Sequence, residues 1–295
     1  MEHWGDGMTT YNNLYLDIRR ELARAGIAAA SLEAREILCR ASDKTKEEFL
    51  RDLGLYMGEE PERQARELLR RRLAGEPAAY LIGEWEFYGL PLSISPGVLI
   101  PRTDTEVLAE AAIAFVRSRP PGARVLDLCA GSGCVGLAVA ANAPECRVLL
   151  ADLMDEAIRL GRENTRRNEL TARVSTARAD ARGKPPAAFG EFDCIVCNPP
   201  YIPSGEIEGL DPSVSRYEPR TALDGGEDGL AFFHSVSSLW KQALKQGGRL
   251  LFECGAGQAP RVYKIMQLSG FGDIETIRDG QGIERVVSGR RESQI

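Results

Sequence analysis

Histidine is scarce in this sequence: only His3 and His234 occur in 295 residues. Zinc centres in proteins usually need several imidazoles or two pairs of cysteines at fixed spacing. Cys194 and Cys197 have the C-x-x-C spacing, but the remaining cysteines form no second pair of this kind. We therefore expect no bound metal.

An excess of positive charge and long apolar runs are also missing. Lys and Arg number 37 against 43 Asp and Glu, which gives a formal net charge of −6 and argues against a stable nucleic-acid partner held through phosphates. No segment approaches the roughly 20 apolar residues of a membrane helix. Seven cysteines without a signal-peptide pattern favour a reducing compartment. We expect a cytoplasmic monomer with no membrane association.

The length of the chain exceeds what one hydrophobic core usually serves, so two domains are expected. From Tyr11 to about Ala74, apolar residues recur at helical spacing, which predicts a small helical bundle. Alternation around Gly89-Leu90-Pro91 predicts a β-hairpin. The expected organisation is a helical domain over 1–75, a hairpin linker over 76–100 and a larger domain over 101–295.

Beyond residue 100, short apolar segments alternate with helical patterns. Strands that alternate with helices are typical of a parallel sheet in an α/β protein. A Rossmann-like domain of seven strands is therefore predicted, with one antiparallel strand at the edge contributed by the short closing pair. The expected strands lie at 125–128, 147–151, 174–179, 192–198, 249–254, 274–277 and 285–288.

A glycine-rich loop connects the first of these strands to a helix. It begins after Val125-Leu126-Asp127-Leu128, and glycines there allow a tight turn and a close approach of a ligand to the helix N-terminus. The next strand ends at Asp152, about 20 residues further on, the spacing at which a carboxylate can bind the ribose hydroxyls of a nucleoside. The candidate nucleoside-binding residues are Asp127, Cys129, Ala130, Gly131, Ser132, Gly133 and Asp152.

The identity of the nucleoside is narrowed by the composition of this loop. It has neither the G-x-G-x-x-G spacing expected for a pyrophosphate nor the lysine of a P-loop. An adenosine ligand without phosphate therefore fits better than NAD. Asp180, at the end of the third strand, could accept a hydrogen bond from the adenine amino group.

The second motif is Asn198-Pro199-Pro200-Tyr201, which follows the apolar run 192–197. Two prolines stiffen the backbone and remove two N–H donors, so the segment presents carbonyls beside the Asn198 amide. Such a segment at the carboxyl end of a strand is a good acceptor for a planar NH2 group. Alone, the tetrapeptide is also a common turn signal; the glycine-rich loop upstream favours a binding function.

Together, 127–133, Asp152 and 198–201 resemble the class I S-adenosylmethionine-dependent methyltransferases that methylate amino groups. Three further segments, 80–87, 98–106 and 218–226, are similar to the release-factor glutamine N5-methyltransferases, the PrmC/HemK family. The resemblance extends from about Leu14 to Arg290.

The resemblance implies S-adenosylmethionine as cofactor, S-adenosylhomocysteine as product, and the Gly-Gly-Gln glutamine of bacterial class 1 release factors as methyl acceptor. It implies that the helical domain helps to bind this protein substrate. Asn198 Oδ1 and the Pro199 carbonyl would accept the two amide hydrogens, with Pro200 and Tyr201 beside the substrate and Asn198 also next to the cofactor. Asp180 and Ala181 would line the adenine pocket, although the family often has an aromatic residue at the position of Ala181.

Three alternatives remain from the sequence. A glutamine methyltransferase of ribosomal protein L3 would share nearly all these motifs. An adenine-N6 methyltransferase could use the same acceptor site for a flipped base, although the acidic balance argues against it. A regulatory module that only binds a nucleoside would not need the stiff acceptor segment.

Overall fold

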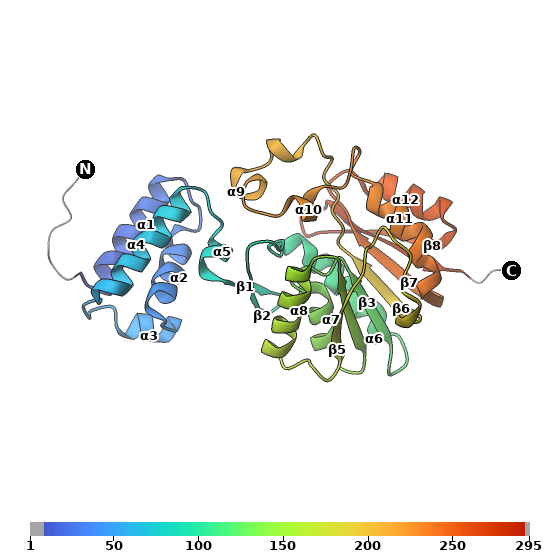
Figure 1. Cartoon of the computed structure of the whole chain (residues 1–295), viewed down its shortest axis with the longest axis horizontal. Helices are drawn as coiled ribbons and strands as arrows, with labels where there is room; N and C mark the ends of the chain where they lie inside the picture. Colours follow the sequence, from blue (N-terminus) through green and yellow to red (C-terminus); the bar gives the residue numbers. More distant parts are fainter. Residues whose placement is uncertain (1–8, 293–295) are drawn as a thin grey trace. The chain divides into compact units, whose positions relative to one another are not determined.

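A computed structural model describes residues 9–292 (Figure 1). The chain divides into two compact units, the first ending at Gly83 and the second beginning at Glu84. The stretch 76–100, which we expected to be a hairpin linker, is divided between them. Its first part forms the short helix α5 (Ala78–Ile82), which follows Pro77 and ends at Gly83 with a φ of +79°.

The first unit consists of helices. The helices before α5 are α1 (Tyr11–Arg24), α2 (Ala30–Ser42), α3 (Lys46–Arg51) and α4 (Glu59–Leu73). A capping box begins α3: the Glu48 amide donates to Thr45 Oγ1 and the Thr45 amide donates to Glu48 Oε2. Apolar side chains at helical spacing form the core of this unit: Leu14, Ile18, Leu22, Ile37, Leu38 and Phe49.

The second unit opens with the predicted β-hairpin, β1 (Glu84–Phe87) and β2 (Leu90–Ser93). Tyr88 and Gly89 join the strands with φ values of +51° and +74°. A two-residue turn with both φ values positive matches the right-handed twist of the flanking strands.

The predicted seven-stranded sheet is confirmed, in the order β5-β4-β3-β6-β7-β9-β8. Its strands are β3 (Arg124–Leu128), β4 (Arg147–Asp152), β5 (Val174–Arg178), β6 (Phe192–Cys197), β7 (Leu244–Glu253), β8 (Phe271–Arg278) and β9 (Glu284–Arg291). The strands from β5 to β7 are parallel, and β9 is antiparallel to both of its neighbours. The prediction of an antiparallel strand at the edge is wrong, because β9 turns back into the position beside β7 and leaves β8 outermost.

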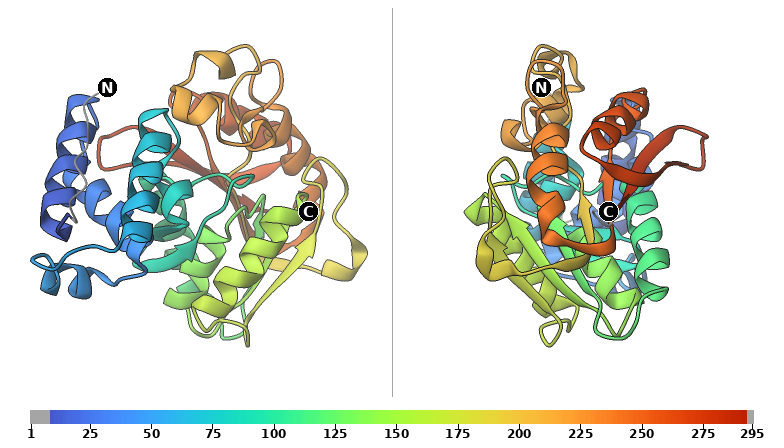
Figure 2. Two further views of the ribbon diagram at one scale, coloured as in Figure 1. Left: turned by 60° about the vertical axis from the view of Figure 1, so that its left-hand side comes forward. Right: turned by 90° about the vertical axis from the view of Figure 1, so that its right-hand side faces the viewer.

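Helices cover both faces of the sheet, as the right-hand view of Figure 2 shows. They are α6 (Glu106–Arg117), α7 (Cys134–Asn142), α8 (Asp155–Arg167), α11 (Ala231–Leu239) and α12 (Ala259–Leu268). Side chains of α11 and α12 pack on the face that carries Leu126, Ile195 and Leu250. No helix among residues 9–292 is long and apolar enough to cross a membrane.

On the opposite face, α7 lies very close to the sheet because of Gly136. A Cβ at this position would overlap Leu150 and lie 3.0 Å from Asp127 Oδ2. The absence of a side chain lets the Gly136 amide donate to Asp127 Oδ2 over 2.7 Å. The N-terminus of α7 is therefore held directly against the end of β3, where the glycine-rich loop lies.

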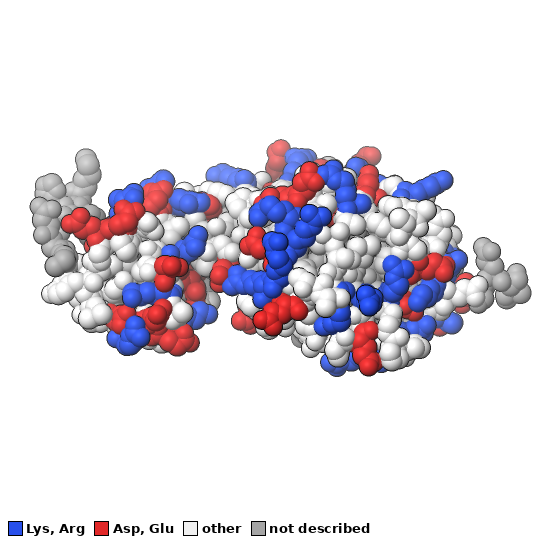
Figure 3. Space-filling model, turned by 60° about the horizontal axis from the view of Figure 1, so that its bottom comes forward, with Lys and Arg blue, Asp and Glu red and all other residues white. Residues whose placement is uncertain are grey.

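Charges of both signs are interspersed on the surface in Figure 3, where a group of basic side chains gathers near the middle of the picture. Part of the basic charge on α8 is balanced locally. Arg159 forms ion pairs with Glu156 at 2.6 Å and Glu163 at 3.1 Å on the same helix. Exposed pairs of this kind each contribute little to stability.

Candidate active site

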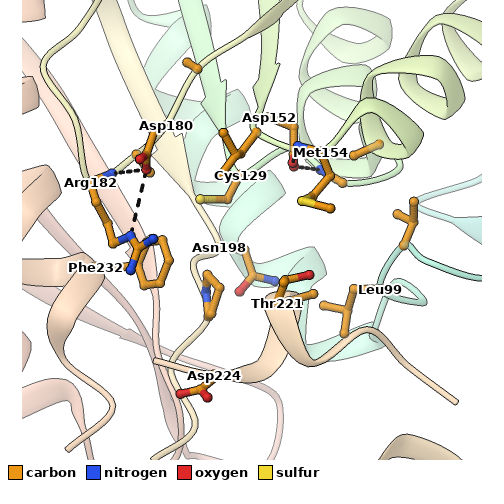
Figure 4. Close-up of a pocket in the computed structure, with 18 of the residues that line it drawn as sticks. Leu99, Cys129, Asp152, Met154, Asp180, Arg182, Asn198, Thr221, Asp224 and Phe232 are labelled. Carbon is orange, nitrogen blue, oxygen red and sulfur yellow. Dashed lines mark hydrogen bonds and ion pairs between the residues drawn. The ribbon is translucent and has the colours of Figure 1, made fainter. Parts of the chain in front are cut away.

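A cavity of about 420 Å3 lies at the carboxyl ends of the parallel strands (Figure 4). It is lined by the loop after β3, the ends of β4 and β5, the segment after β6 and the start of α11. A smaller recess of about 40 Å3 shares four lining residues with it, so the two hollows are adjacent: Leu99, Cys129, Gly131 and Asn198. The carboxyl edge is where ligands bind in open α/β sheets.

The structure brings most of the predicted site residues to these two hollows. Those that line the cavity are Cys129, Gly131, Asp152, Asp180, Ala181, Asn198 and Pro200. The recess adds Asp127, Ala130 and Ser132. Gly133, Pro199 and Tyr201 line neither hollow.

The glycine-rich loop turns sharply between β3 and α7. Cys129 has a φ of +62°, which is uncommon for a residue with a side chain, and Gly133 has a φ of +83°. The Gly133 amide donates to the Ala130 carbonyl over 2.7 Å, which closes the turn. The loop thereby brings its backbone against the cavity.

Asp152 is the acidic residue at the end of β4. Its Oδ2 accepts from the Gly131 amide at 2.9 Å and its Oδ1 accepts from the Met154 amide at 3.0 Å. Burial raises the pKa of this carboxyl group above its ordinary value. Each carboxylate oxygen keeps a second lone pair, so Asp152 can still accept hydrogen bonds from two ribose hydroxyls.

Asp127 lies deeper, at the recess. Burial raises its pKa to about 7, opposed by the hydrogen bond from the Gly136 amide. Its position at the N-terminus of α7 favours the ionised form. Asp127 thus fixes the end of α7 and presents a carboxyl group to the recess.

Phe232 of α11 places an aromatic ring at the end of the cavity where Asp180 and Arg182 lie (Figure 4). Ala181 is buried, and its carbonyl accepts from the Trp240 indole N–H at 3.0 Å. The guanidinium of Arg182 lies 5.5 Å from the centre of the Phe232 ring, and its backbone amide donates to Asp180 Oδ1. The sequence does not distinguish Phe232 as a site residue, because Phe232 and Phe233 both fit a buried helix pattern; in the structure only Phe233 is fully buried.

Within the segment 198–201, the side chains of Asn198 and Tyr201 point in different directions. Asn198 faces the cavity, and its Nδ2 donates to Thr105 Oγ1 at 3.4 Å. Tyr201 turns toward β7, where its hydroxyl donates to Glu253 Oε1 at 3.4 Å and its carbonyl accepts from Gln258 Nε2 at 2.9 Å. Burial raises the pKa of Tyr201, so its hydroxyl stays protonated.

The segment 201–228 forms short helical turns and returns to the tetrapeptide 198–201. The turns are η3 (Ile207–Gly209), α9 (Pro212–Ser215) and α10 (Arg220–Leu223). Ile202 and Asp224 form a bridge, and a Cβ at Gly225 would lie 2.8 Å from the Tyr201 Cα. This close return places Thr221 of α10 along the cavity wall (Figure 4).

An ion pair joins the two motifs at 98–106 and 218–226. The Glu218 carboxylate pairs with Arg102, and its Oε2 accepts from the Ile100 amide at 3.1 Å. Glu218 is buried whereas Arg102 is partly exposed. Because 97–99 and 221–222 both line the cavity, this pair ties two of its walls together.

The chemistry of these residues fits an adenosine ligand. The Asp152 carboxylate lies at the end of β4. The Phe232 ring and the Asp180 carboxyl group lie at one end of the cavity, and the Asn198 amide lies at its wall. S-adenosylmethionine combines an adenosine with a methyl sulfonium. The amide of Asn198 is positioned to accept a hydrogen bond from a group that enters beside such a ligand.

Two family models match the chain: the methyltransferase small domain over residues 105–209 and the PrmC N-terminal domain over residues 13–83. The release factor glutamine methyltransferase of Geobacter sulfurreducens is 40% identical over 278 residues, which cover 92% of this chain and 93% of the relative. The release factor glutamine methyltransferase of Thermodesulfovibrio yellowstonii is 37% identical over 258 residues, which cover 86% of this chain and 90% of the relative. The fold is shared with the crystal structure of the hMettl16 catalytic domain, with a TM-score of 0.57. The two chains are 14% identical, and the match covers 78% of this chain and 84% of that one.

Proposed function

Because this chain belongs to the family of release factor glutamine methyltransferases, we propose that it transfers a methyl group from S-adenosylmethionine to the side-chain amide nitrogen of glutamine in the Gly-Gly-Gln motif of class 1 release factors. S-adenosylhomocysteine is the second product. The observation that supports this most directly is the Asn198 amide in the wall of the same cavity as Asp152.

S-adenosylmethionine supplies an electrophilic methyl group when bound. Asp152 would accept from its ribose hydroxyls, and Phe232 with Asp180 would hold the adenine. Asp127 and the loop 129–133 would hold the amino-acid end beside the recess.

The methyl acceptor is a poor nucleophile, because the lone pair of an amide nitrogen is delocalised into its carbonyl. Asn198 Oδ1 and the Pro199 carbonyl would accept its two hydrogens and direct the nitrogen toward the methyl group. The same acceptors would stabilise the positive charge that develops as the nitrogen becomes tetrahedral. Pro200 would flank the planar amide, and the proton leaves to water after transfer. Tyr201, which turns toward β7, would support the segment from behind rather than touch the amide.

The helical unit is proposed to help bind the release factor, since residues 13–83 match the PrmC N-terminal domain. We place the reaction in the cytoplasm, because all seven cysteines are free thiols, as in proteins of reducing compartments. The enzyme is proposed to act as a monomer. The net charge of −6 gives no support for a stable nucleic-acid partner.

Incubation of the enzyme with labelled S-adenosylmethionine should label purified release factor but not a release factor in which the Gly-Gly-Gln glutamine is replaced by alanine. The reason is that only a primary amide offers two hydrogens and the nitrogen that the site would orient. Ribosomal protein L3 and duplex DNA serve as parallel substrates. Label on either of these with none on release factor would contradict the substrate assignment and leave the methyltransferase assignment intact.

Replacing Phe232 by alanine should raise the Kd for S-adenosylmethionine about tenfold, because stacking of a base on an aromatic ring contributes about 1–3 kcal/mol. Isothermal titration calorimetry measures the change. Tyr263→Ala, on α12 and outside the cavity lining, is the matched control and should bind like wild type. Equal affinity for Phe232→Ala and wild type would show that the adenine does not stack on Phe232.

A further inference from the structure

Three arginines lie in a row at the amino ends of neighbouring parallel strands, at the opposite edge of the sheet from the cavity. Arg124 begins β3 and Arg147 begins β4, and the two are directly opposite each other in the register of these strands. Arg173 immediately precedes β5, and its carbonyl accepts from the Val148 amide at 2.9 Å. The row therefore crosses three strands, and neighbouring strands in a sheet are about 4.8 Å apart.

All three arginines line a third hollow, of about 200 Å3, which we call the amino-edge hollow. Two hydroxyl-bearing residues, Thr171 and Ser175, also line it. The other lining residues are apolar: Val125, Val148, Leu149, Ala172, Val174 and Phe192. No Asp or Glu of the described residues 9–292 lines the amino-edge hollow. A hollow with three cationic groups and no carboxylate in its lining is suited to an anion.

The positive charge of this row is not balanced within the described part of the chain. None of the three guanidinium groups forms an ion pair among residues 9–292. Asp193 accepts from the Arg124 backbone amide at 2.8 Å but forms its ion pair with Lys245. Glu191, whose carbonyl accepts from Arg124, pairs through its carboxylate with Arg291. Like charges directly opposite each other on neighbouring strands are destabilising, so a bound anion would relieve this repulsion.

Main-chain carbonyls hold the arginines at the two ends of the row. The Arg124 guanidinium donates to the Glu191 carbonyl at 2.8 Å and to the Phe189 carbonyl at 2.7 Å. That of Arg173 donates to the Ala140 carbonyl at 2.7 Å. A carbonyl orients a guanidinium without removing its charge, and a guanidinium has five N–H donors. Both groups therefore keep donors for a ligand while their positions are fixed.

We propose that this row of arginines is a binding site for a diphosphate group. Guanidinium groups donate in pairs to phosphate oxygens, and these charge-assisted hydrogen bonds are strong. Three neighbouring cations favour two linked phosphates over a single one, because each phosphate can then meet a different guanidinium. Arg147 is exposed and has no side-chain hydrogen bond or ion pair among residues 9–292, so its whole donor fork is available to the ligand. The site is separate from the cavity and does not depend on the proposed reaction.

Calorimetric titration with pyrophosphate, uridine diphosphate, inorganic phosphate and citrate tests this site. Uridine is chosen because an adenine ligand would also enter the cavity. We expect pyrophosphate and uridine diphosphate to bind, and inorganic phosphate and citrate to bind more weakly than either. Equal affinities for the two diphosphates mean that the phosphates alone are recognised, whereas tighter binding of uridine diphosphate adds contacts from the nucleoside. Both affinities should fall as salt is raised, since exposed charges are screened.

Arg147→Gln should raise the Kd for pyrophosphate about tenfold, because the ligand loses the hydrogen bonds of one charged group. Arg147→Glu should abolish binding, since it places a negative charge within the row. Arg24→Gln is the matched control. Arg24, in the last turn of α1, is also exposed and also has no side-chain hydrogen bond or ion pair among residues 9–292, so this variant should bind pyrophosphate like wild type.

A wild-type protein that binds neither diphosphate would overturn the proposal, as would an unchanged Kd for pyrophosphate in Arg147→Gln and Arg147→Glu. Tighter binding of citrate than of pyrophosphate would contradict the preference for phosphate. A short single-stranded RNA is titrated in parallel. Binding of this RNA without binding of either diphosphate would assign the row to a nucleic-acid backbone instead.

Discussion

Replacing Asn198 by alanine is expected to lower kcat for release factor methylation about 100- to 1,000-fold, the usual effect of removing one preorganised hydrogen-bonding group from a transition state. The amide nitrogen gains positive charge only as the methyl group is transferred. An acceptor held at that point therefore stabilises the transition state more than the bound substrate. The truncation removes this acceptor and leaves the Pro199 carbonyl alone.

The measurement is steady-state label transfer from S-adenosylmethionine, combined with calorimetry of cofactor binding. A fall in kcat much larger than the rise in Kd is the expected pattern, since Asn198 lies at the wall of the cavity while Asp152 and Phe232 would hold the nucleoside. Asn142→Ala is the matched control, because the half-buried Asn142 amide at the end of α7 donates only to the Ala138 carbonyl. Near-normal kcat in Asn198→Ala would exclude Asn198 as the acceptor.

Replacing Asp152 by alanine should raise the Kd for S-adenosylmethionine about 100-fold or more. Hydrogen bonds to a charged group contribute about 1.5–3 kcal/mol each, and two ribose hydroxyls would lose their acceptor. The Gly131 and Met154 amides would also lose their acceptors, so the wall of the cavity would loosen. Both effects act on binding, which makes this the largest expected change in affinity.

Asp155→Ala supplies the comparison for this effect. Asp155 lies three residues further on, is 84% exposed at its side chain, and pairs with Arg178 at the surface. Its removal changes the net charge equally and should leave the Kd unchanged. Asp152→Asn should give an intermediate Kd, since the amide keeps one oxygen acceptor but loses the charge. Wild-type affinity in Asp152→Ala would place the ribose elsewhere.

Local patterns alone predicted the elements of this protein and most of the candidate site residues that line its cavity and recess. Apolar periodicity predicted the helices and the seven strands, and the hairpin followed from alternation around Gly89. These features depend on neighbours within a few residues in the chain. Their hydrogen bonds and burial are therefore decided by residue types that can be read locally.

Only the tertiary structure decided which distant side chains meet. Phe232 reaches the cavity from α11, Glu218 pairs with Arg102 across 116 residues of sequence, and β9 lies beside β7 rather than at the edge. The hydrogen bond from Asn198 Nδ2 to Thr105 Oγ1 likewise joins residues 93 apart in the sequence. Such contacts are set by the order of strands and the packing of helices upon them, which involve residues far apart in the chain. A local pattern carries the chemistry of each side chain but not the partner that the fold brings to it.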